Sequence, residues 1–151
     1  MNHWLMKSEP DVFSIDDLKK KKKSGWDGVR NYQARNYMRD DMKLGDLVLF
    51  YHSSCEVPGV AGLAKVCKTS HSDPSQFDSK SEYYDPKATK DEPRWFMVEV
   101  EFVEKFDEVV SLSTLKATKS LDKMPLVQKG SRLSINPVNE KEFKIITEMA
   151  Q

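Results

Sequence analysis

The segment from Arg94 to Phe106 constrains the fold more than any other part of the chain. It reads RWFMVEVEFVEKF, in which apolar side chains alternate along the segment. Phe96, Val98 and Val100 fall on one face of an extended strand, whereas Trp95 falls on the other face. Period-two alternation of this length is typical of a strand with one face in the core. The sequence therefore predicts a β-sheet whose main apolar row does not include Trp95.

Further strands are expected before and after this segment. Leu47–His52 is apolar on both faces, which is typical of a central strand. Pro58–Ser70 is expected to pair with it through a hairpin at Ser53–Val57. Two shorter strands are predicted at His3–Lys7 and at Arg132–Ile135.

Helix starts are indicated by two capping-box patterns. Ser14 is followed three residues later by Asp17, and Asn139 is followed three residues later by Glu142. The first helix is expected to end at Gly25. The lysine run Lys19–Lys23 suits a solvated helix end, although a patch that steers phosphates is an open alternative.

The segment Gly25–Asp41 reads GWDGVRNYQARNYMRDD and divides into a loop and a helix. From about Gln33 the apolar residues recur at helical spacing and predict one buried stripe. The members of this stripe are Ala34, Met38 and Met42. Polar side chains collect where the loop meets the helix, and free backbone N–H groups at such a point can bind an electron-rich ligand.

The long polar segment His71–Pro93 has three prolines and little periodicity. Loops longer than about 12–15 residues are uncommon in compact domains and are often functional. We expect the pair Tyr83–Tyr84 to anchor it. Strands and helices otherwise mix along the chain, so we predict one α+β domain over residues 1–151. A small curved sheet or a partly closed barrel flanked by short helices fits this order of elements.

Charge and cysteine content narrow the class of protein. Twenty-four basic residues balance twenty-four acidic residues, so the basic excess of a phosphate-binding protein is absent overall. Cys55 and Cys67 form no CxxC pattern, and a disulfide framework is not expected. The start of the chain lacks a signal-peptide pattern, and no apolar stretch approaches the ~20 residues that span a bilayer. We expect an intracellular protein without membrane contact, located in the cytoplasm, or in the nucleus if its source is eukaryotic.

Catalytic and metal-binding patterns are sparse. The three histidines have no metal-ligand spacing to one another or to a cysteine, and no phosphate-binding or nucleophile-elbow motif occurs. Cys55 near His52 is the one candidate for a nucleophile pair, with an inert thiol as the alternative. We therefore expect no cofactor and no bound metal.

A binding pattern remains. Aromatic residues lie at loops, strand ends and a helix start: Trp26, Tyr32, Tyr51, Tyr84 and Trp95. Polar residues accompany them: Lys7, Ser8, Asn31, Gln33, Arg35, His52 and Ser53. A nucleobase needs such a mixture, because it presents a flat face for stacking and a polar edge for hydrogen bonds. Ordinary packing at the edge of the core is the alternative, and Arg35 can also pair with Asp40 or Asp41.

Six blocks spread over nearly the whole chain resemble the EVE domain family. They are WLMKSEP, WDGVRNYQARN, GDLVLFYHS, PGVAGLAKV, YYDPKATKDEPRW and MPLVQKGSRLSINPV. The resemblance implies a PUA-like fold, that is, a small barrel-like sheet with flanking helices. It also implies a reader of modified bases in DNA or RNA that works with a separate effector protein.

The resemblance places the ligand site on three of the blocks. It implies Lys7 and Ser8, Asn31 to Arg35, and Tyr51 to Ser53 as binding residues, and Arg30 is a candidate next to the second of these. Trp26, Tyr84, Trp95 and Arg132 are further candidates. Two other functions stay open: an enzyme that processes nucleic acid or nucleotides, and a module that binds small molecules or nucleosides.

Overall fold

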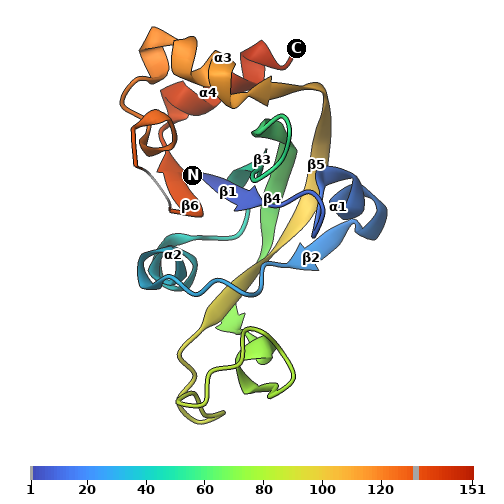
Figure 1. Cartoon of the computed structure of the whole chain (residues 1–151), viewed down its shortest axis with the longest axis vertical. Coiled ribbons are helices and arrows are strands. Elements are labelled where there is room, and N and C mark those ends of the chain that lie inside the picture. Colours follow the sequence, from blue (N-terminus) through green and yellow to red (C-terminus); the bar gives the residue numbers. More distant parts are fainter. Residues whose placement is uncertain (1, 131–132) are drawn as a thin grey trace.

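The computed structural model describes residues 2–130 and 133–151, which form a six-stranded sheet with short helices around it (Figure 1). The strands are β1 (His3–Ser8), β2 (Lys23–Gly25), β3 (Leu47–His52), β4 (Gly59–Ser72), β5 (Phe96–Ser111) and β6 (Ile135–Val138). Their order in the sheet is β2-β5-β4-β3-β1-β6. The pair β1–β3 is parallel and the other pairs are antiparallel. The predicted α+β class is confirmed, and of the two expected forms the open sheet is the one found.

The helical segments of the described chain are short. They are α1 (Ile15–Lys21), α2 (Tyr32–Asn36), η1 (Tyr37–Asp41), η2 (Pro74–Phe77), α3 (Leu112–Ala117), η3 (Lys119–Leu121), η4 (Pro125–Val127) and α4 (Glu140–Met149). Both predicted capping boxes are confirmed, at Ser14 with Asp17 and at Asn139 with Glu142. The hairpin between β3 and β4 is also confirmed.

Two boundary predictions are wrong, and one strand is not predicted from the sequence. The first helix ends at Lys22, whose φ is +74° and whose N–H donates to the Leu18 carbonyl, and not at Gly25. Gly25 instead closes β2, a strand that the sequence did not predict and that pairs with β5. The last strand begins at Ile135 and not at Arg132. Arg132 lies outside the described residues.

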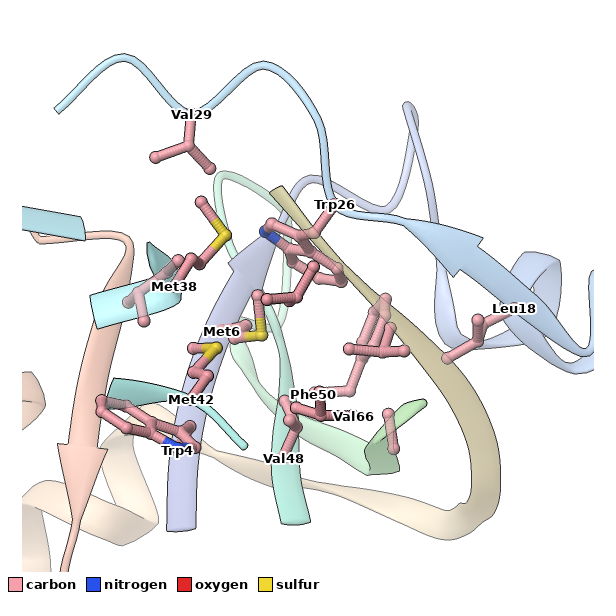
Figure 2. Packing of buried hydrophobic residues seen from close by; sticks show 14 of the residues in the cluster. Trp4, Met6, Leu18, Trp26, Val29, Met38, Met42, Val48, Phe50 and Val66 are labelled. Atoms are coloured by element: carbon pink, nitrogen blue, oxygen red, sulfur yellow. The ribbon is translucent and has the colours of Figure 1, made fainter. Parts of the chain in front are cut away.

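Alternate residues of the central strands enter two separate cores. Trp4, Met6 and Phe50 pack with α1 and α2, on what we call the α1–α2 face. Leu5, Leu49 and Tyr51 pack with α3 and α4, on what we call the α3–α4 face. Figure 2 shows the first of these cores, in which Trp26 lies close to Met6 and the ring of Phe50. The helices thus cover both sides of the sheet, as expected for strands that are apolar on both faces.

The predicted stripe on the second helix is confirmed in this core, because Ala34, Met38 and Met42 are all buried there. They hold α2 and η1 against the sheet below the loop that starts at Trp26 (Figure 2). The position of this loop is therefore fixed from beneath by apolar packing.

The strands β4 and β5 are much longer than the others and form a two-stranded ribbon beyond the rest of the sheet (Figure 1). The segment 73–95 connects their ends, at the end of the molecule opposite α3 and α4. The sequence predicts this segment as a loop, and apart from η2 it consists of turns and irregular structure. It lies beside the loop 26–31, which it contacts through Asp73 and Tyr83.

Candidate functional site

An open cleft of about 810 Å³ lies beside the α1–α2 core. Three parts of the chain line most of it: the end of β1 with the turn after it, the loop 26–30, and Tyr83 of the segment 73–95. Its polar lining includes Lys7, Ser8, Asp27 and Arg30. Clefts of roughly 300–1,000 Å³ are the usual size for small-ligand sites. The cleft can therefore hold one flat polar molecule.

The end of β1 forms one wall of the cleft. The Ser8 hydroxyl donates to the Phe13 carbonyl at 2.6 Å, so its oxygen lone pairs remain available to a ligand. Lys7 is half-buried, its ammonium nitrogen lies 5.9 Å from the centre of the Tyr51 ring, and burial lowers its pKa. This wall therefore offers an acceptor at Ser8, whereas the Lys7 side chain reaches toward Tyr51 of the α3–α4 face.

Trp26 forms part of the cleft floor and part of the core. Its ring is 8% exposed and meets Phe50 edge to face, with the ring centroids 5.5 Å apart. Its N–H backbone group donates to the Val98 carbonyl at 2.8 Å. Trp26 is thus held rigidly, and only a small part of it is exposed to a ligand in the cleft.

Asp73 fixes the loop 26–30 in place. Its buried carboxylate accepts hydrogen bonds from the Gly28 N–H at 2.8 Å, from Arg30 Nη1 at 3.2 Å and from Ser75. Burial alone would raise the pKa of Asp73, but the bonds from Ser75 and Gly28 outweigh it, so the pKa is lowered. The carboxylate remains ionised and pairs with Arg30. This one residue joins the two loops that form the cleft.

Gly28 allows Tyr83 to approach the loop. The φ angle of Gly28 is +78°, and a Cβ at this position would lie 2.7 Å from the Tyr83 ring. The Arg30 side chain donates to the Tyr83 carbonyl from Nη2 at 2.7 Å and from Nε at 3.1 Å. Tyr83 is therefore the anchoring member of the expected pair. Tyr84 is 44% exposed and does not line the cleft.

Asp27 lies at the mouth of the cleft and is exposed. Partial burial of its carboxyl group, followed by the negative charge of Asp73, raises its pKa. Arg30 and Lys21 act in the opposite direction. A carboxylate in this position can accept hydrogen bonds from the N–H groups of a base edge.

Gln76 holds the far ends of the segment 73–95 together. Its buried amide donates to the carbonyls of Asp73 and Trp95, both at 2.7 Å. Its carbonyl oxygen accepts from the N–H groups of Arg94 and Trp95, both at 2.9 Å. A single side chain thus bonds to four backbone groups at the two ends of the segment.

Several of the predicted residues gather on a second surface next to the cleft. Tyr32 stacks on Trp95 with 4.9 Å between the ring centroids and 20° between the planes. Arg35 lies beside this pair of rings, with its guanidinium carbon 4.7 Å from the centre of the Tyr32 ring. Arg35 bonds to the Asn36 side chain and to the Arg94 carbonyl, and Asp40 pairs with Arg39 instead. The alternative pairing of Arg35 with Asp40 or Asp41 is therefore wrong.

The remaining predicted residues lie apart from the cleft lining. Asn31 caps α2 by accepting from the Ala34 N–H at 3.0 Å, and Gln33 is exposed beside Tyr37. Tyr51 is buried on the α3–α4 face, where burial raises its pKa to about 12. The His52 ring accepts from the Ile15 N–H at 3.1 Å, and the Ser53 N–H donates to the Ser8 carbonyl.

The structure also brings residues to the cleft that the sequence analysis did not select. Among them are Glu9, Val12, Phe13, Lys21, Asp27, Val29 and Tyr83. Lys21 belongs to the lysine run Lys19–Lys23, for which phosphate steering is an open alternative. The sequence indicates the pair Tyr83–Tyr84 as an anchor of the long segment, but it does not indicate which of the two tyrosines lines the cleft. Nothing in the sequence links Asp73 to Gly28 across 45 positions.

Within residues 2–130 and 133–151, no three His, Cys, Asp or Glu side chains are arranged to share a metal ion. Both cysteines are free. No helix in the described part of the chain has the length and apolar character needed to cross a bilayer.

Comparison with known proteins gives consistent matches along the chain. The EVE domain model matches residues 2–149. Human thymocyte nuclear protein 1 is 42% identical over 99% of this chain and 74% of that protein. The mouse protein of the same name is 41% identical with the same coverage.

Solved structures agree with these sequence matches. A protein from Pseudomonas syringae superposes with a TM-score of 0.95 at 49% identity, covering 99% of both chains. Human THYN1 protein in complex with 5-methylcytosine-containing DNA superposes with a TM-score of 0.93 at 42% identity, covering 100% of this chain and 98% of that one. A YTH domain from Zygosaccharomyces rouxii, in complex with N6-methyladenosine RNA, has a TM-score of 0.56 at 14% identity, covering 99% and 86%. This last likeness shows a shared fold.

Proposed function

The chain belongs to the EVE domain family, and we propose that it binds nucleic acid and recognises one modified base in the cleft beside Trp26. The observation that carries the proposal is the cleft itself, formed by rigidly held aromatic and polar residues. A relative of 42% identity, similar in structure over the whole chain, was solved with DNA that contains 5-methylcytosine. We take the whole chain as one EVE domain for this purpose.

The cleft has groups for each part of a base. Trp26 and Tyr83 give apolar contact for the ring and for a methyl substituent. Asp27 accepts from an exocyclic amino group. Cytosine and adenine both present such a group, and the relative solved with 5-methylcytosine-containing DNA favours cytosine. Methylated cytosine in DNA is therefore the first ligand to test.

The zero net charge of the chain supports recognition through one base. Affinity that depends mainly on phosphate contacts needs a basic excess and falls steeply with salt. A base taken out of its stack into a cleft gains specific contacts that do not depend on overall charge. We therefore expect a shallow dependence of affinity on salt concentration.

Binding without turnover is our proposal for the chemistry. Among the residues that the structure describes, the cleft lining contains two carboxylates, of Glu9 and Asp27, and no histidine or cysteine. The side chain of His52 is engaged with the Ile15 N–H, and the free thiol of Cys55 lies in the turn after β3. We further propose that the protein acts inside the cell, and that a separate effector protein acts on what it reads.

The test is a binding titration with short oligonucleotides that carry one 5-methylcytosine or one cytosine at the same position. They are offered as single strands and as duplexes, at two salt concentrations. We expect tighter binding to the methylated form and a shallow salt slope. Equal binding to both forms with a steep salt slope would refute the proposal. Turnover of labelled substrate, or equally tight binding of the free nucleoside, would favour the enzyme or the nucleoside-binding module instead.

A further inference from the structure

The wall of the cleft continues outward as alternating aromatic rings and guanidinium groups. The guanidinium carbon of Arg30 lies 5.4 Å from the centre of the Tyr83 ring and 5.1 Å from that of the Trp95 ring. Trp95 in turn stacks on Tyr32. Tyr83 and Arg30 line the cleft, so this series of contacts leads from the cleft to the exposed ring of Tyr32.

Tyr32 has the properties of a stacking platform. Its side chain is 48% exposed, whereas the Trp95 ring beneath it is only 6% exposed. Arg35 lies beside the stacked pair, with its guanidinium carbon 4.7 Å from the centre of the Tyr32 ring and 5.8 Å from that of the Trp95 ring, so it does not cover the face of Tyr32 that points away from Trp95. Arg94 donates a hydrogen bond to the Tyr32 hydroxyl group. The ring is therefore held in one orientation before any ligand arrives. Pre-organised aromatic side chains of this kind bind bases without sequence preference.

The charges around Tyr32 leave one cation without an acidic partner. Arg30 pairs with Asp73, Arg39 with Asp40, and Arg94 with Asp85. In the part of the chain that the structure describes, Arg35 makes no such ion pair, and its hydrogen bonds go to neutral oxygens. Partial burial, followed by the positive charge of Arg39, lowers the pKa of Arg35. An anion placed here would be stabilised by a guanidinium group that forms no ion pair with the described carboxylates.

We propose that Tyr32, Arg35 and Arg94, supported by Trp95, bind the nucleotide next in the strand to the base in the cleft. We call this set the Tyr32 surface. The neighbouring base stacks on the Tyr32 ring, and the phosphate between the two nucleotides lies against Arg35. The inference rests on the proposed function, since the neighbouring nucleotide is defined relative to a base in the cleft. It predicts that a strand is bound more tightly than the single modified nucleotide.

The test compares two ligands of the purified full chain. One is 5-methyldeoxycytidine monophosphate, and the other is a single strand of about five nucleotides with 5-methylcytosine at its centre. We expect Tyr32→Ala to weaken strand binding by about 5- to 20-fold and to leave mononucleotide binding unchanged. This expected effect is at the low end of what base stacking on an aromatic side chain contributes, because Tyr32 stays half-exposed. Arg35→Gln is expected to reduce the slope of log affinity against log salt by about 0.7 for the strand.

Matched variants separate this role from general effects. Tyr32→Phe keeps the ring and should retain most strand affinity. Lys144→Gln removes an exposed positive charge from α4, at the other end of the molecule, and should leave both ligands unaffected (Figure 1). The melting temperature of each variant confirms that it is folded.

The outcomes distinguish the two proposals. If the wild type selects the methylated strand but Tyr32→Ala and Arg35→Gln bind it equally well, the Tyr32 surface has no role and the proposed function stands. If the variants lose affinity equally for methylated and unmethylated strands and the wild type does not discriminate, the surface is a general site and the inference is overturned. A wild type that binds neither strand overturns both proposals.

Discussion

The two faces of the sheet are built on different interactions. On the α3–α4 face, Leu115, Leu121 and Ile146 fill a core with apolar side chains. On the α1–α2 face an apolar core also exists, but the loops that extend beyond it are joined by the side chains of Asp73 and Gln76. Asp73, which joins the two loops, is called the hub here. Its hydrogen bonds depend on distance and angle, whereas apolar packing depends mainly on volume. The cleft therefore lies where directional bonds set the positions of the loops.

This difference predicts that the same loss of apolar volume has different consequences on the two faces. Ile146→Ala and Met38→Ala each remove a fully buried side chain, and each should lower the free energy of unfolding by about 2–5 kcal/mol. Only Met38→Ala should also weaken binding of the methylated strand, since Met38 supports the α1–α2 face. Denaturant unfolding and binding titrations of both variants measure this. Equal effects on binding would show that the two faces are coupled.

The second prediction concerns the hub. Asp73→Asn keeps the shape of the side chain but removes the charge that Arg30 pairs with and one acceptor for Gly28. We expect a loss of about 2 kcal/mol in unfolding free energy, because bonds to charged groups contribute roughly 1.5–3 kcal/mol and Arg30 is partly solvated. Binding of the methylated strand should fall in parallel. Ser113→Ala on α3, an exposed polar residue far from the cleft, serves as the control. Unchanged binding by Asp73→Asn would show that the loop keeps its position without the hub.

The third prediction uses the acidity of Asp27. Its pKa is raised, so its carboxylate becomes protonated at a higher pH than an ordinary aspartate as the solution is acidified. An accepting carboxylate is lost on protonation, and affinity for a cytosine-type base should therefore decrease as pH falls toward that pKa. Asp27→Asn should remove this pH dependence and reduce discrimination against bases that lack the amino group by about 1 kcal/mol. Titrations between pH 4 and pH 8, within the range where aspartates titrate in proteins, test this. A wild-type profile that stays flat would exclude Asp27 from the base edge.

The smallest effect is expected at His52. Burial lowers the pKa of His52 in the folded protein below its unfolded value, so the unfolded chain binds the proton more tightly. Stability is fully present above the unfolded pKa and decreases as pH falls below about 6.5. His52→Gln removes the titration, and the lost bond from the Ile15 N–H should cost about 1 kcal/mol at pH 7. Thermal unfolding at pH 7 and pH 5 measures the difference. A wild type that is equally stable at both pH values would contradict the prediction.

The same contrast explains which features the sequence predicts. Capping boxes, the hairpin and the stripe of Ala34, Met38 and Met42 are local patterns, and all are confirmed. The strand β2 was missed because three residues carry no periodicity and only pairing with β5 defines it. The end of α1 was mispredicted because Lys22 ends the helix with a positive φ angle. Glycine is the residue that usually takes this conformation, and the sequence therefore favours Gly25.

For the candidate site, the sequence identified the end of β1, Trp26 and Arg30 as cleft residues but not the residues that face them. Which tyrosine of the pair at 83–84 turns inward depends on contact with Gly28, which is distant in the sequence. By contrast, alternation along a strand is enough to predict that the side chains of Tyr51 and His52 lie on opposite faces of the sheet.

The positions of the three tryptophans allow the protein to report its own binding by fluorescence. Trp26 lines the cleft, Trp95 lies beneath the Tyr32 surface, and Trp4 donates to Asp46 in the core away from both. Replacing two of the three by phenylalanine leaves one emitter at a known place. A base that enters the cleft should quench the fluorescence of the variant that keeps Trp26, and a neighbouring nucleotide should quench that of the variant that keeps Trp95. The fluorescence of the variant that keeps Trp4 should stay constant and serves as the control. The order in which the first two signals change would then give the order in which a strand engages the protein.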